Sequence, residues 1–239
     1  MTVALLSDIH GNLMALEAVL GALPPVEGLW VTGDTVGYGP DPSDVLALLL
    51  ERGALMVAGN HDRAVATGAG LALFNRHAAD AARLHAEWLS AEERDVLASL
   101  PETAVRGAFT LCHGSLRDPL WEYMQTPGAA AASLAIADTA HGCCGHTHVP
   151  ALFRGGSAAT ILVRPADGTV WDLEGRAFVN PGSVGQPRDG DPRASYALLD
   201  PERASVSFHR VTYDVAETQR RIRAQKLPAI LADRLAHGL

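Results

Sequence analysis

The chain has 239 residues, 48% of them hydrophobic and 19% charged, so it is long enough to bury a full core without help from disulfides. Its formal net charge of −8 and its single lysine, Lys226, argue against a long nucleic acid as partner, because affinity for a polyanion depends mostly on Lys and Arg. No apolar run reaches the roughly 18 residues of a membrane span, and the start of the chain lacks the pattern of a secretory signal, so we expect no membrane partner.

Apolar runs alternate with helical stretches over the first sixty residues. The runs predict strands at Val3–Leu6, Leu29–Val31 and Leu55–Ala58. Helices are predicted at Asn12–Leu23, where Asn12 can cap the first turn, and near Ser43–Glu51. Strands that alternate with helices predict parallel pairing and an α/β fold with a layered sheet.

The middle of the chain changes character twice. Residues 63–100 are Ala-rich and helical, and Ser90 followed by Glu93 forms a capping box for the last helix of this stretch. Strand character returns at Ala104–Cys112, a helix is predicted at about Pro127–Asp138, and Gly142–Gly145 is a short apolar segment.

The last third of the chain predicts short strands with turn signals, mainly in antiparallel pairing. The strands are expected at Ala151–Arg154, Thr160–Arg164, Val170–Leu173, Ala177–Val179, Tyr196–Leu199 and Ser205–Val211. Helical stretches near Val215–Lys226 and Ala229–His237 follow. Without a linker between these segments, we expect one domain over residues 1–239, with a helical insert at about 63–100.

Three cysteines occur in the chain, and two of them, Cys143 and Cys144, are adjacent. An odd number with this spacing argues against a disulfide framework and fits a reducing compartment. We therefore expect a cytoplasmic protein whose cysteines, including Cys112, serve as small apolar packing residues.

Polar residues follow five of the predicted strands or apolar segments. These motifs are Asp8-Ile9-His10, Gly33-Asp34, Gly59-Asn60-His61-Asp62, Cys112-His113-Gly114 and Gly145-His146-Thr147-His148. At the end of a strand, side chains at positions i and i+2 share a face, so the carboxylate of Asp8 and the imidazole of His10 can reach one cation. Glycines before several of the polar residues allow close backbone approach. Ligands of open α/β sheets bind outside the carboxyl ends of the strands, where these motifs are expected.

Each motif also has an ordinary structural interpretation. A single Asp or Asn is more often a turn or cap residue, and a single His is more often a surface or core residue. Five such motifs at successive strand ends favour a metal centre instead. A third interpretation takes Gly33–Gly39 as a phosphate-binding nucleotide loop, but this segment lacks the Gly-Lys-Ser/Thr ending of a P-loop.

The order of these motifs resembles that of the calcineurin-like metallophosphoesterase superfamily, and the resemblance extends to Asn180-Pro181-Gly182-Ser183. It implies a two-sheet β-sandwich flanked by helices, a four-layer α/β/β/α architecture. It also implies two metal sites that share Asp34. The first would be held by Asp8, His10, Asp34 and His148, and the second by Asp34, Asn60, His113 and His146.

Two divalent ions about 3.5–4 Å apart can clamp the attacking and departing oxygens of a phosphoryl displacement and convert a bridging water to hydroxide. The expected cofactors are therefore two divalent or transition metal ions. The ligand types suit manganese, the first choice for an assay, and also iron, zinc or nickel.

His61 corresponds to the histidine of the family that is not a metal ligand and that protonates the leaving oxygen, so we expect it to be catalytic. Protein serine/threonine phosphatases of the superfamily carry G-D-x-x-D-R-G, whose second Asp orients that histidine, whereas this chain has Gly37 at the corresponding position. The partner that orients His61 is thus left open. Candidate substrate contacts are Asn12, Arg63, Arg117, Trp121, Tyr123 and Arg188.

The function expected from these motifs is hydrolysis of small phosphodiesters or phosphomonoesters by attack of a metal-bridging hydroxide. The alternatives are a protein serine/threonine phosphatase, a dinucleoside polyphosphate hydrolase, or a non-catalytic metal-binding regulatory protein of the same fold. The oligomeric state is left open.

Overall fold

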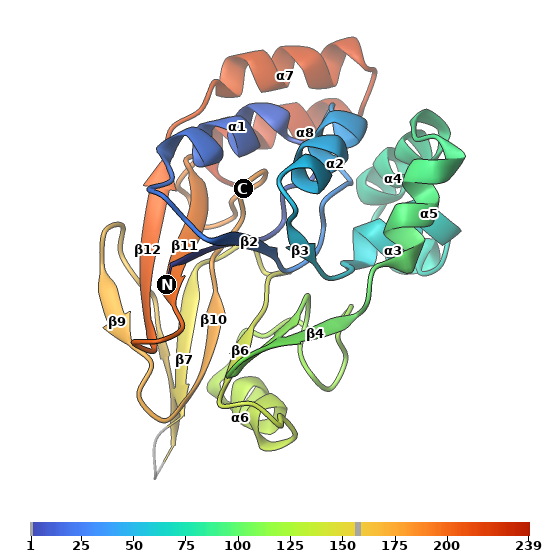
Figure 1. Cartoon of the computed structure of the whole chain (residues 1–239). Coiled ribbons are helices and arrows are strands. Elements are labelled where there is room, and N and C mark those ends of the chain that lie inside the picture. Colours follow the sequence, from blue (N-terminus) through green and yellow to red (C-terminus); the bar gives the residue numbers. More distant parts are fainter. Residues whose placement is uncertain (1, 156–158) are drawn as a thin grey trace.

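The computed structural model describes residues 2–155 and 159–239, which form two mixed six-stranded sheets packed face to face (Figure 1). In spatial order, sheet A contains β3 (Leu55–Met56), β2 (Gly28–Val31), β1 (Val3–Leu6), β11 (Ala194–Asp200), β12 (Ser205–Val211) and β9 (Val170–Asp172). Sheet B contains β4 (Thr103–Arg106), β5 (Phe109–Cys112), β6 (His141–Cys143), β10 (Arg176–Asn180), β7 (Ala151–Gly155) and β8 (Thr160–Val163).

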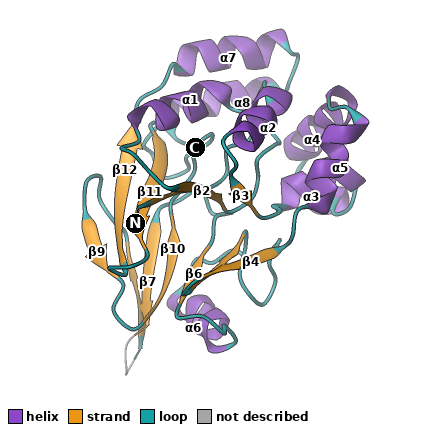
Figure 2. Cartoon of the chain, viewed as in Figure 1, coloured by secondary structure: helices purple, strands orange, loops and turns teal. Residues whose placement is uncertain are grey.

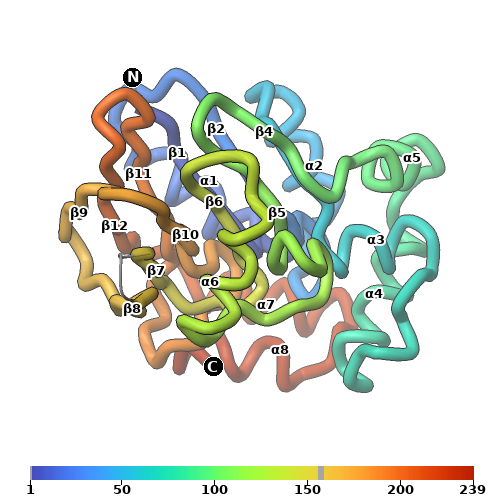
Figure 3. The backbone as a smooth tube through the Cα atoms, turned by 90° about the horizontal axis from the view of Figure 1, so that it is seen from below, coloured from blue at the N-terminus to red at the C-terminus, as the bar shows by residue number. Residues whose placement is uncertain are grey.

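Helices flank both sheets (Figure 2). The outer face of sheet A is covered by α1 (Leu13–Ala22), α2 (Pro42–Glu51), α7 (Val215–Ala224) and α8 (Ala229–Asp233). The view from below in Figure 3 shows α6 (Pro127–Ala135) over sheet B. Beside the sheets lie α3 (Asn60–Thr67), α4 (Arg76–Trp88) and α5 (Ala91–Ser99). The predicted α/β class and four-layer order are therefore confirmed.

Strand periodicity separates the core into layers. In β1, Leu5 packs between the two sheets, whereas its neighbour Leu6 packs against the helices on sheet A. In β10, Val179 belongs to the core between the sheets and Phe178 packs with residues of α6. Successive side chains of a strand point to opposite faces, so strands buried on both faces are apolar throughout.

The pairing explains where the polar motifs meet. Strands β1, β2 and β3 are mutually parallel, as predicted, and β5, β6 and β10 form a second parallel group in sheet B. The remaining pairs of the last third are antiparallel, which was also predicted. The loops after the strands of each parallel group meet at one edge of its sheet, and the contacts described below join the two sets of loops.

One strand prediction was wrong. The segment Ala104–Cys112 is not a single strand but an antiparallel hairpin of β4 and β5. Gly107 has φ +57°, in the left-handed region that glycine tolerates, and the chain turns there. β4 is a mostly exposed edge strand and β5 is buried, but both contain apolar residues. The sequence therefore shows one strand-like pattern that continues across the turn.

The predicted helix starts are confirmed. The Asn12 side chain accepts a hydrogen bond from the Ala15 amide, and Ser90 and Glu93 form the expected capping box. Residues 63–100 contain no strand, but the first helix of this region begins earlier, at Asn60. No helix in residues 2–155 and 159–239 is long and apolar enough to cross a membrane. That the chain is a single domain stays a prediction.

Candidate metal centre

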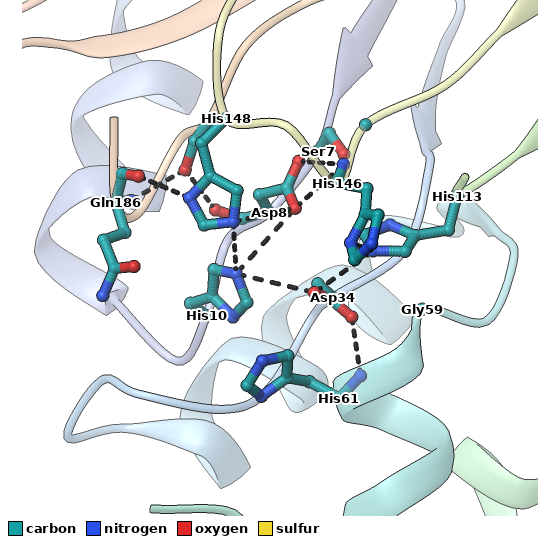
Figure 4. A network of polar contacts seen from close by, with 12 residues as sticks. Ser7, Asp8, His10, Asp34, Gly59, His61, His113, His146, His148 and Gln186 are labelled. Carbon is teal, nitrogen blue, oxygen red and sulfur yellow. Dashed lines mark hydrogen bonds and ion pairs between the residues drawn. The ribbon is translucent and has the colours of Figure 1, made fainter. Parts of the chain in front are cut away.

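Seven buried side chains converge where the parallel strands of both sheets end. Figure 4 labels Asp8, His10, Asp34, His113, His146 and His148 among them. Each of them is at most 4% exposed. The loops after β1 and β2 supply Asp8, His10 and Asp34, and the first residue of α3, which follows β3, is Asn60. The loops after β5 and β6 supply His113, His146 and His148. The structure thus brings together every residue that the sequence proposed as a ligand.

The first site is formed around Nε2 of His148. This atom lies 3.1 Å from His10 Nε2 and 3.2 Å from Asp8 Oδ1. Asp34 Oδ2 lies 3.6 Å from His10 Nε2 and completes the group. With metal–ligand bonds of about 2.0–2.2 Å, donor atoms about 3 Å apart can contact one common ion.

The second site is formed around Nε2 of His113. It lies 3.0 Å from His146 Nδ1, 3.1 Å from Asn60 Oδ1 and 3.2 Å from Asp34 Oδ2. The same carboxylate oxygen of Asp34 therefore faces both groups of donors. This is the arrangement that a bridging ligand needs.

Backbone carbonyls fix the tautomer of each imidazole, because a carbonyl oxygen only accepts hydrogen bonds. Nδ1 of His10 lies 3.0 Å from the Val36 carbonyl, Nδ1 of His113 lies 2.8 Å from that of Thr32, and Nδ1 of His148 contacts that of Gln186. His146 is reversed, with Nε2 lying 3.2 Å from the Trp121 carbonyl. When neutral, each ring thus presents a lone pair to the centre.

The donor set fits metal ions for this reason. Lone pairs of His10 and His148 face each other at 3.1 Å, next to the carboxylates of Asp8 and Asp34. Such a concentration of acceptors without a donor between them is electrostatically unfavourable unless a cation lies there. The residues present therefore fit two cations.

The charges at the second site are coupled. Burial lowers the pKa of His113, but the charge and hydrogen bond of Asp34 outweigh this effect and raise it to about 9. Burial alone would raise the pKa of Asp34, but His113 and His61 hold it well below its usual range. A proton and a metal ion compete for Nε2 of His113, so metal binding at this site should release protons.

The backbone of the ligand loops is unusual. Five ligands have positive φ angles between 51° and 65°, namely Asp8, His10, Asp34, His146 and His148. Asp8 and His10 therefore reach one site from a loop beyond β1, and the strand alternation assumed for them was wrong. Non-glycine residues in this region are sparsely populated and cost energy, and they cluster at functional sites.

Close packing of the loops explains two of the glycines. A Cβ on Gly59 would lie 2.0 Å from Asp34 Oδ1, and a Cβ on Gly33 would lie 2.8 Å from the Cα of Gly59. The buried carboxylate of Asp62 joins the same loops, since it accepts hydrogen bonds from the amides of Gly59 and Val36. The sequence analysis gave Asp62 no role.

The segment Asn180-Pro181-Gly182-Ser183 donates hydrogen bonds to the loops that contain the candidate ligands. Asn180 donates to the Gly145 carbonyl at 2.7 Å, and Ser183 donates to the Asp8 carbonyl at 2.7 Å. These hydrogen bonds connect the ligand loops of the two sheets.

His61 lies beside the centre with an unusual environment. Its amide donates to Asp34 Oδ1 at 2.9 Å, and its ring stacks on Phe74 with centroids 4.4 Å apart. Its Nδ1 is buried without a hydrogen-bond partner among the described residues. A Cβ on Gly37 would lie 2.3 Å from that atom, so the position where related phosphatases carry an orienting Asp is closed to any side chain here.

Stacking therefore orients the His61 ring in place of a carboxylate. A ring nitrogen of His61 also lies within 4.8 Å of donor atoms of His10 and Asp34, so geometry alone permits it as a ligand. Burial lowers the pKa of His61 to about 4. The ring is consequently neutral at pH 7 in this environment.

A cavity of about 300 Å³ opens onto the centre. Among the proposed substrate contacts, Arg188, Trp121 and Tyr123 line it, and Asn12, Arg63 and Arg117 do not. Arg188 lies over the Tyr38 ring at 5.7 Å, and its buried Nε has no partner among the described residues. Arg188 supplies positive charge to the cavity wall beside both groups of donors, which suits a phosphate.

The other three residues make structural contacts. Asn12 caps α1 and donates to the Gly185 carbonyl at 2.9 Å. Arg63 donates to the carbonyls of Ala98 and Leu100 at the end of α5, and Arg117 pairs with Glu122.

Five residues of the cavity wall were not predicted from the sequence: Tyr38, Leu73, Phe74, Asn75 and Ala78. Tyr38 was part of a glycine-rich segment whose shape the sequence does not define. The other four lie in the helical insert, where the available signal was the apolar pair Leu73-Phe74 directly before the helix cap Asn75.

Gly33–Gly39 does not act as a nucleotide-binding loop in this structure. The amide of Val36 donates to Asp62, that of Gly37 to His85 Nδ1, and that of Gly39 to the His10 carbonyl. These N–H groups already have protein partners and cannot bind phosphate.

Comparisons with known proteins agree with this geometry. The sequence profile of the calcineurin-like phosphoesterase superfamily domain matches residues 1–204. The crystal structure of a metallophosphoesterase from Sphaerobacter thermophilus is similar, with a TM-score of 0.92 and 41% identity, over 100% of this chain and 99% of that chain. An uncharacterized protein of Methanocaldococcus jannaschii is 33% identical over 99% of this chain and 98% of its own length.

A shorter similarity concerns the symmetrical bis(5'-nucleosyl)-tetraphosphatase of Pectobacterium carotovorum subsp. carotovorum. It is 42% identical over 67 residues, which are 26% of this chain and 24% of that protein.

Proposed function

This chain belongs to the calcineurin-like phosphoesterase superfamily, and we propose that it is a binuclear metal-dependent hydrolase that cleaves small phosphodiesters or phosphomonoesters. One observation carries the proposal: Asp34 Oδ2 faces the donors of both sites, 3.6 Å from His10 Nε2 and 3.2 Å from His113 Nε2. A shared carboxylate between two donor groups supports two adjacent ions rather than one.

Two bound divalent ions would supply Lewis acidity to the phosphoryl group and lower the pKa of the attacking water. Asp8, His10, Asp34 and His148 would hold one ion, and Asp34, Asn60, His113 and His146 the other. Manganese, iron, zinc and nickel all suit imidazole combined with oxygen ligands.

The remaining residues of the cavity bind and orient the substrate. The guanidinium of Arg188, which lines the cavity, attracts the phosphate and opposes the excess negative charge of the protein. His61 donates a hydrogen bond to the leaving oxygen. Burial lowers the pKa of His61 and keeps its ring neutral, with a proton on one nitrogen only. The hydrogen bond from that N–H stabilises the negative charge that develops on the leaving oxygen.

The test is a screen of the manganese-loaded protein against phosphomonoesters, linear and cyclic diesters, dinucleoside polyphosphates, phosphopeptides and duplex DNA. We expect small soluble esters to be turned over far better than duplex DNA or phosphopeptides, given the net charge of −8 and a cavity of about 300 Å³. Elemental analysis should find two ions per chain.

Asp34→Asn is the matched variant, because it keeps the shape of the shared ligand and removes its charge. Both ions and the activity should be lost together. One ion per chain in the loaded wild type would overturn the binuclear proposal. Two bound ions without turnover of any ester would instead support a non-catalytic regulatory protein.

Dinucleoside polyphosphate hydrolysis is the second candidate. The similarity to a bis(5'-nucleosyl)-tetraphosphatase favours it, although this similarity covers only 26% of the chain. The same substrate screen distinguishes the two candidate functions, because a dinucleoside polyphosphate hydrolase would prefer dinucleoside polyphosphates to simple esters.

A further inference from the structure

We propose that the cavity at the metal centre is a nucleotide site, in which an aromatic wall holds the base while the metal centre holds the phosphate. The placement of the phosphate rests on the proposed function. The aromatic wall consists of Leu73, Phe74, Trp121 and Tyr123, which all line the cavity.

The cavity has two chemically different parts. Charged and metal-ligating groups, among them Asp34, His148 and Arg188, line one part, and the aromatic wall lines the other. A volume of about 300 Å³ is at the lower end of the range of about 300–1,000 Å³ for small-ligand sites. A ligand that fills it needs an anionic group and a flat apolar group joined by a short connection.

The aromatic wall is built from two segments that are distant in sequence. The Trp121 ring lies against the backbone of Gly70, where a Cβ would lie 2.3 Å from Cζ2, so the indole holds the helical insert in place. Phe74, from the insert, lies 5.7 Å from the Trp121 ring between centroids. The two rings form adjacent sides of the cavity at an angle of 58°.

Tyr123 and Leu73 leave apolar surface uncovered. Tyr123 stacks on the ligand His146 at 3.8 Å between ring centroids, yet it stays 48% exposed. Leu73 is 71% exposed. Aromatic and apolar surface next to a charged site is the arrangement on which a nucleobase stacks, and such stacking is tolerant of base identity.

A polar group favours a base over a simple aryl group. Asn75 lines the cavity, and its Oδ1 already caps α4 by accepting from the Ala78 amide at 3.0 Å. Its Nδ2 group makes no hydrogen bond with the described residues and can donate to an acceptor on the edge of a base. A phenyl ring offers no such acceptor.

The test compares two ligands that differ only in the base: the phosphonate analogues of adenosine 5′-monophosphate and of ribose 5-phosphate, in which CH₂ replaces the ester oxygen. Neither can be hydrolysed, so calorimetry with the manganese-loaded protein measures binding alone. We expect the adenosine compound to bind about 10- to 100-fold more tightly, as stacking on aromatic side chains predicts.

Variants of the aromatic wall test which residues cause the preference for the adenosine compound. Trp121→Leu should remove most of this preference and Trp121→Phe should retain part of it. Leu73→Ser, at an exposed position, should reduce the preference without a change in folding. Trp171→Leu in β9, at the opposite edge of sheet A from β3, is the matched control and should leave the preference intact.

Equal affinity for the two compounds in the wild type would overturn the nucleotide site. So would a preference that survives both Trp121→Leu and Leu73→Ser. If no ester is hydrolysed but the adenosine compound still binds more tightly through Trp121, the nucleotide site stands and the proposed hydrolase function fails.

Discussion

At the scale of single residues, His61 is held by rings rather than by a carboxylate. Phe74 stacks on it at 4.4 Å, and Tyr38 and His10 lie 4.4 and 4.9 Å away between centroids. Gly37 leaves room for the ring but provides no side chain to orient Nδ1. The orientation of His61 therefore depends on shape, and any atom added at Gly37 disturbs it.

Removal of His61 should reveal its role at the leaving group. In His61→Ala we expect both ions retained, with hydrolysis of alkyl esters reduced about 10²- to 10⁴-fold, the usual range for a positioned acid or hydrogen-bond donor. Aryl esters such as p-nitrophenyl phosphate should lose less rate, because their leaving oxygen needs less stabilisation. Steady-state kinetics with both ester types and elemental analysis check this.

A second variant displaces His61 without removing it. Gly37→Ala places a methyl group 2.3 Å from His61 Nδ1, so it should reproduce part of the same selective loss. Gly68→Ala is the matched control, since Gly68 also has a positive φ, +78°, but has open space at its Cβ.

Loss of metal in His61→Ala, or equal rate losses for alkyl and aryl esters, would show instead that His61 is a ligand or a phosphate-binding group.

At the scale of elements, helix caps and strand-end loops position the site. Asn12 is buried, caps α1, donates to Gly185 and accepts a hydrogen bond from Thr218 in α7. Gly185 in turn donates its amide to the Asp8 carbonyl. The cap of the first helix is thus connected to a ligand loop, which gives Asn12 a structural role outside the cavity.

Asn12→Ala and Ser90→Ala compare a buried cap with an exposed one. Ser90→Ala should cost about 1 kcal/mol of unfolding free energy, the typical value of a cap. Asn12→Ala should cost about 2–4 kcal/mol, because it also leaves the buried Gly185 carbonyl without its donor. Thermal unfolding should show a drop of about 2–4 °C per kcal/mol. An increased KM with an unchanged Tm would instead support the substrate contact first proposed for Asn12.

At the scale of the whole molecule, the metal centre joins the two sheets. Sheet A contributes Asp8, His10, Asp34 and Asn60 through the loops after its parallel strands, and sheet B contributes His113, His146 and His148. Ions bound by both sets of loops would stabilise the contact between the sheets. Folding and metal binding should therefore be linked.

Metal removal should lower the stability of the whole fold. A ligand present at 100 times its Kd stabilises the native state by about 2.7 kcal/mol per site, so chelation of the loaded protein should lower Tm by about 5 °C or more. Manganese added back should restore it. Asp34→Asn, which cannot hold the ions, should show no shift on chelation. An unchanged Tm in the wild type would mean that the sheets pack independently of the centre.

The sequence by itself determined most of the elements and the residue types at the candidate centre. Strand and helix periodicity are local properties, and so are caps such as Asn12 and Ser90, so these were predicted close to their observed positions. Polar residues at successive strand ends indicated where a site would lie, because parallel pairing brings those ends together. Which of them are candidate ligands followed from the resemblance of the motifs to those of the superfamily.

Tertiary structure alone decided how the centre is held and what surrounds it. Three features depend on contacts between segments far apart in the chain. They are the left-handed backbone at Asp8 and His10, the hydrogen bonds from the Val36 and Gly59 amides to Asp62, and the stacking of Phe74 on His61. The aromatic wall likewise joins the insert to Trp121 and Tyr123. No local pattern encodes such contacts, because each depends on where a distant loop is placed by the packing of the two sheets.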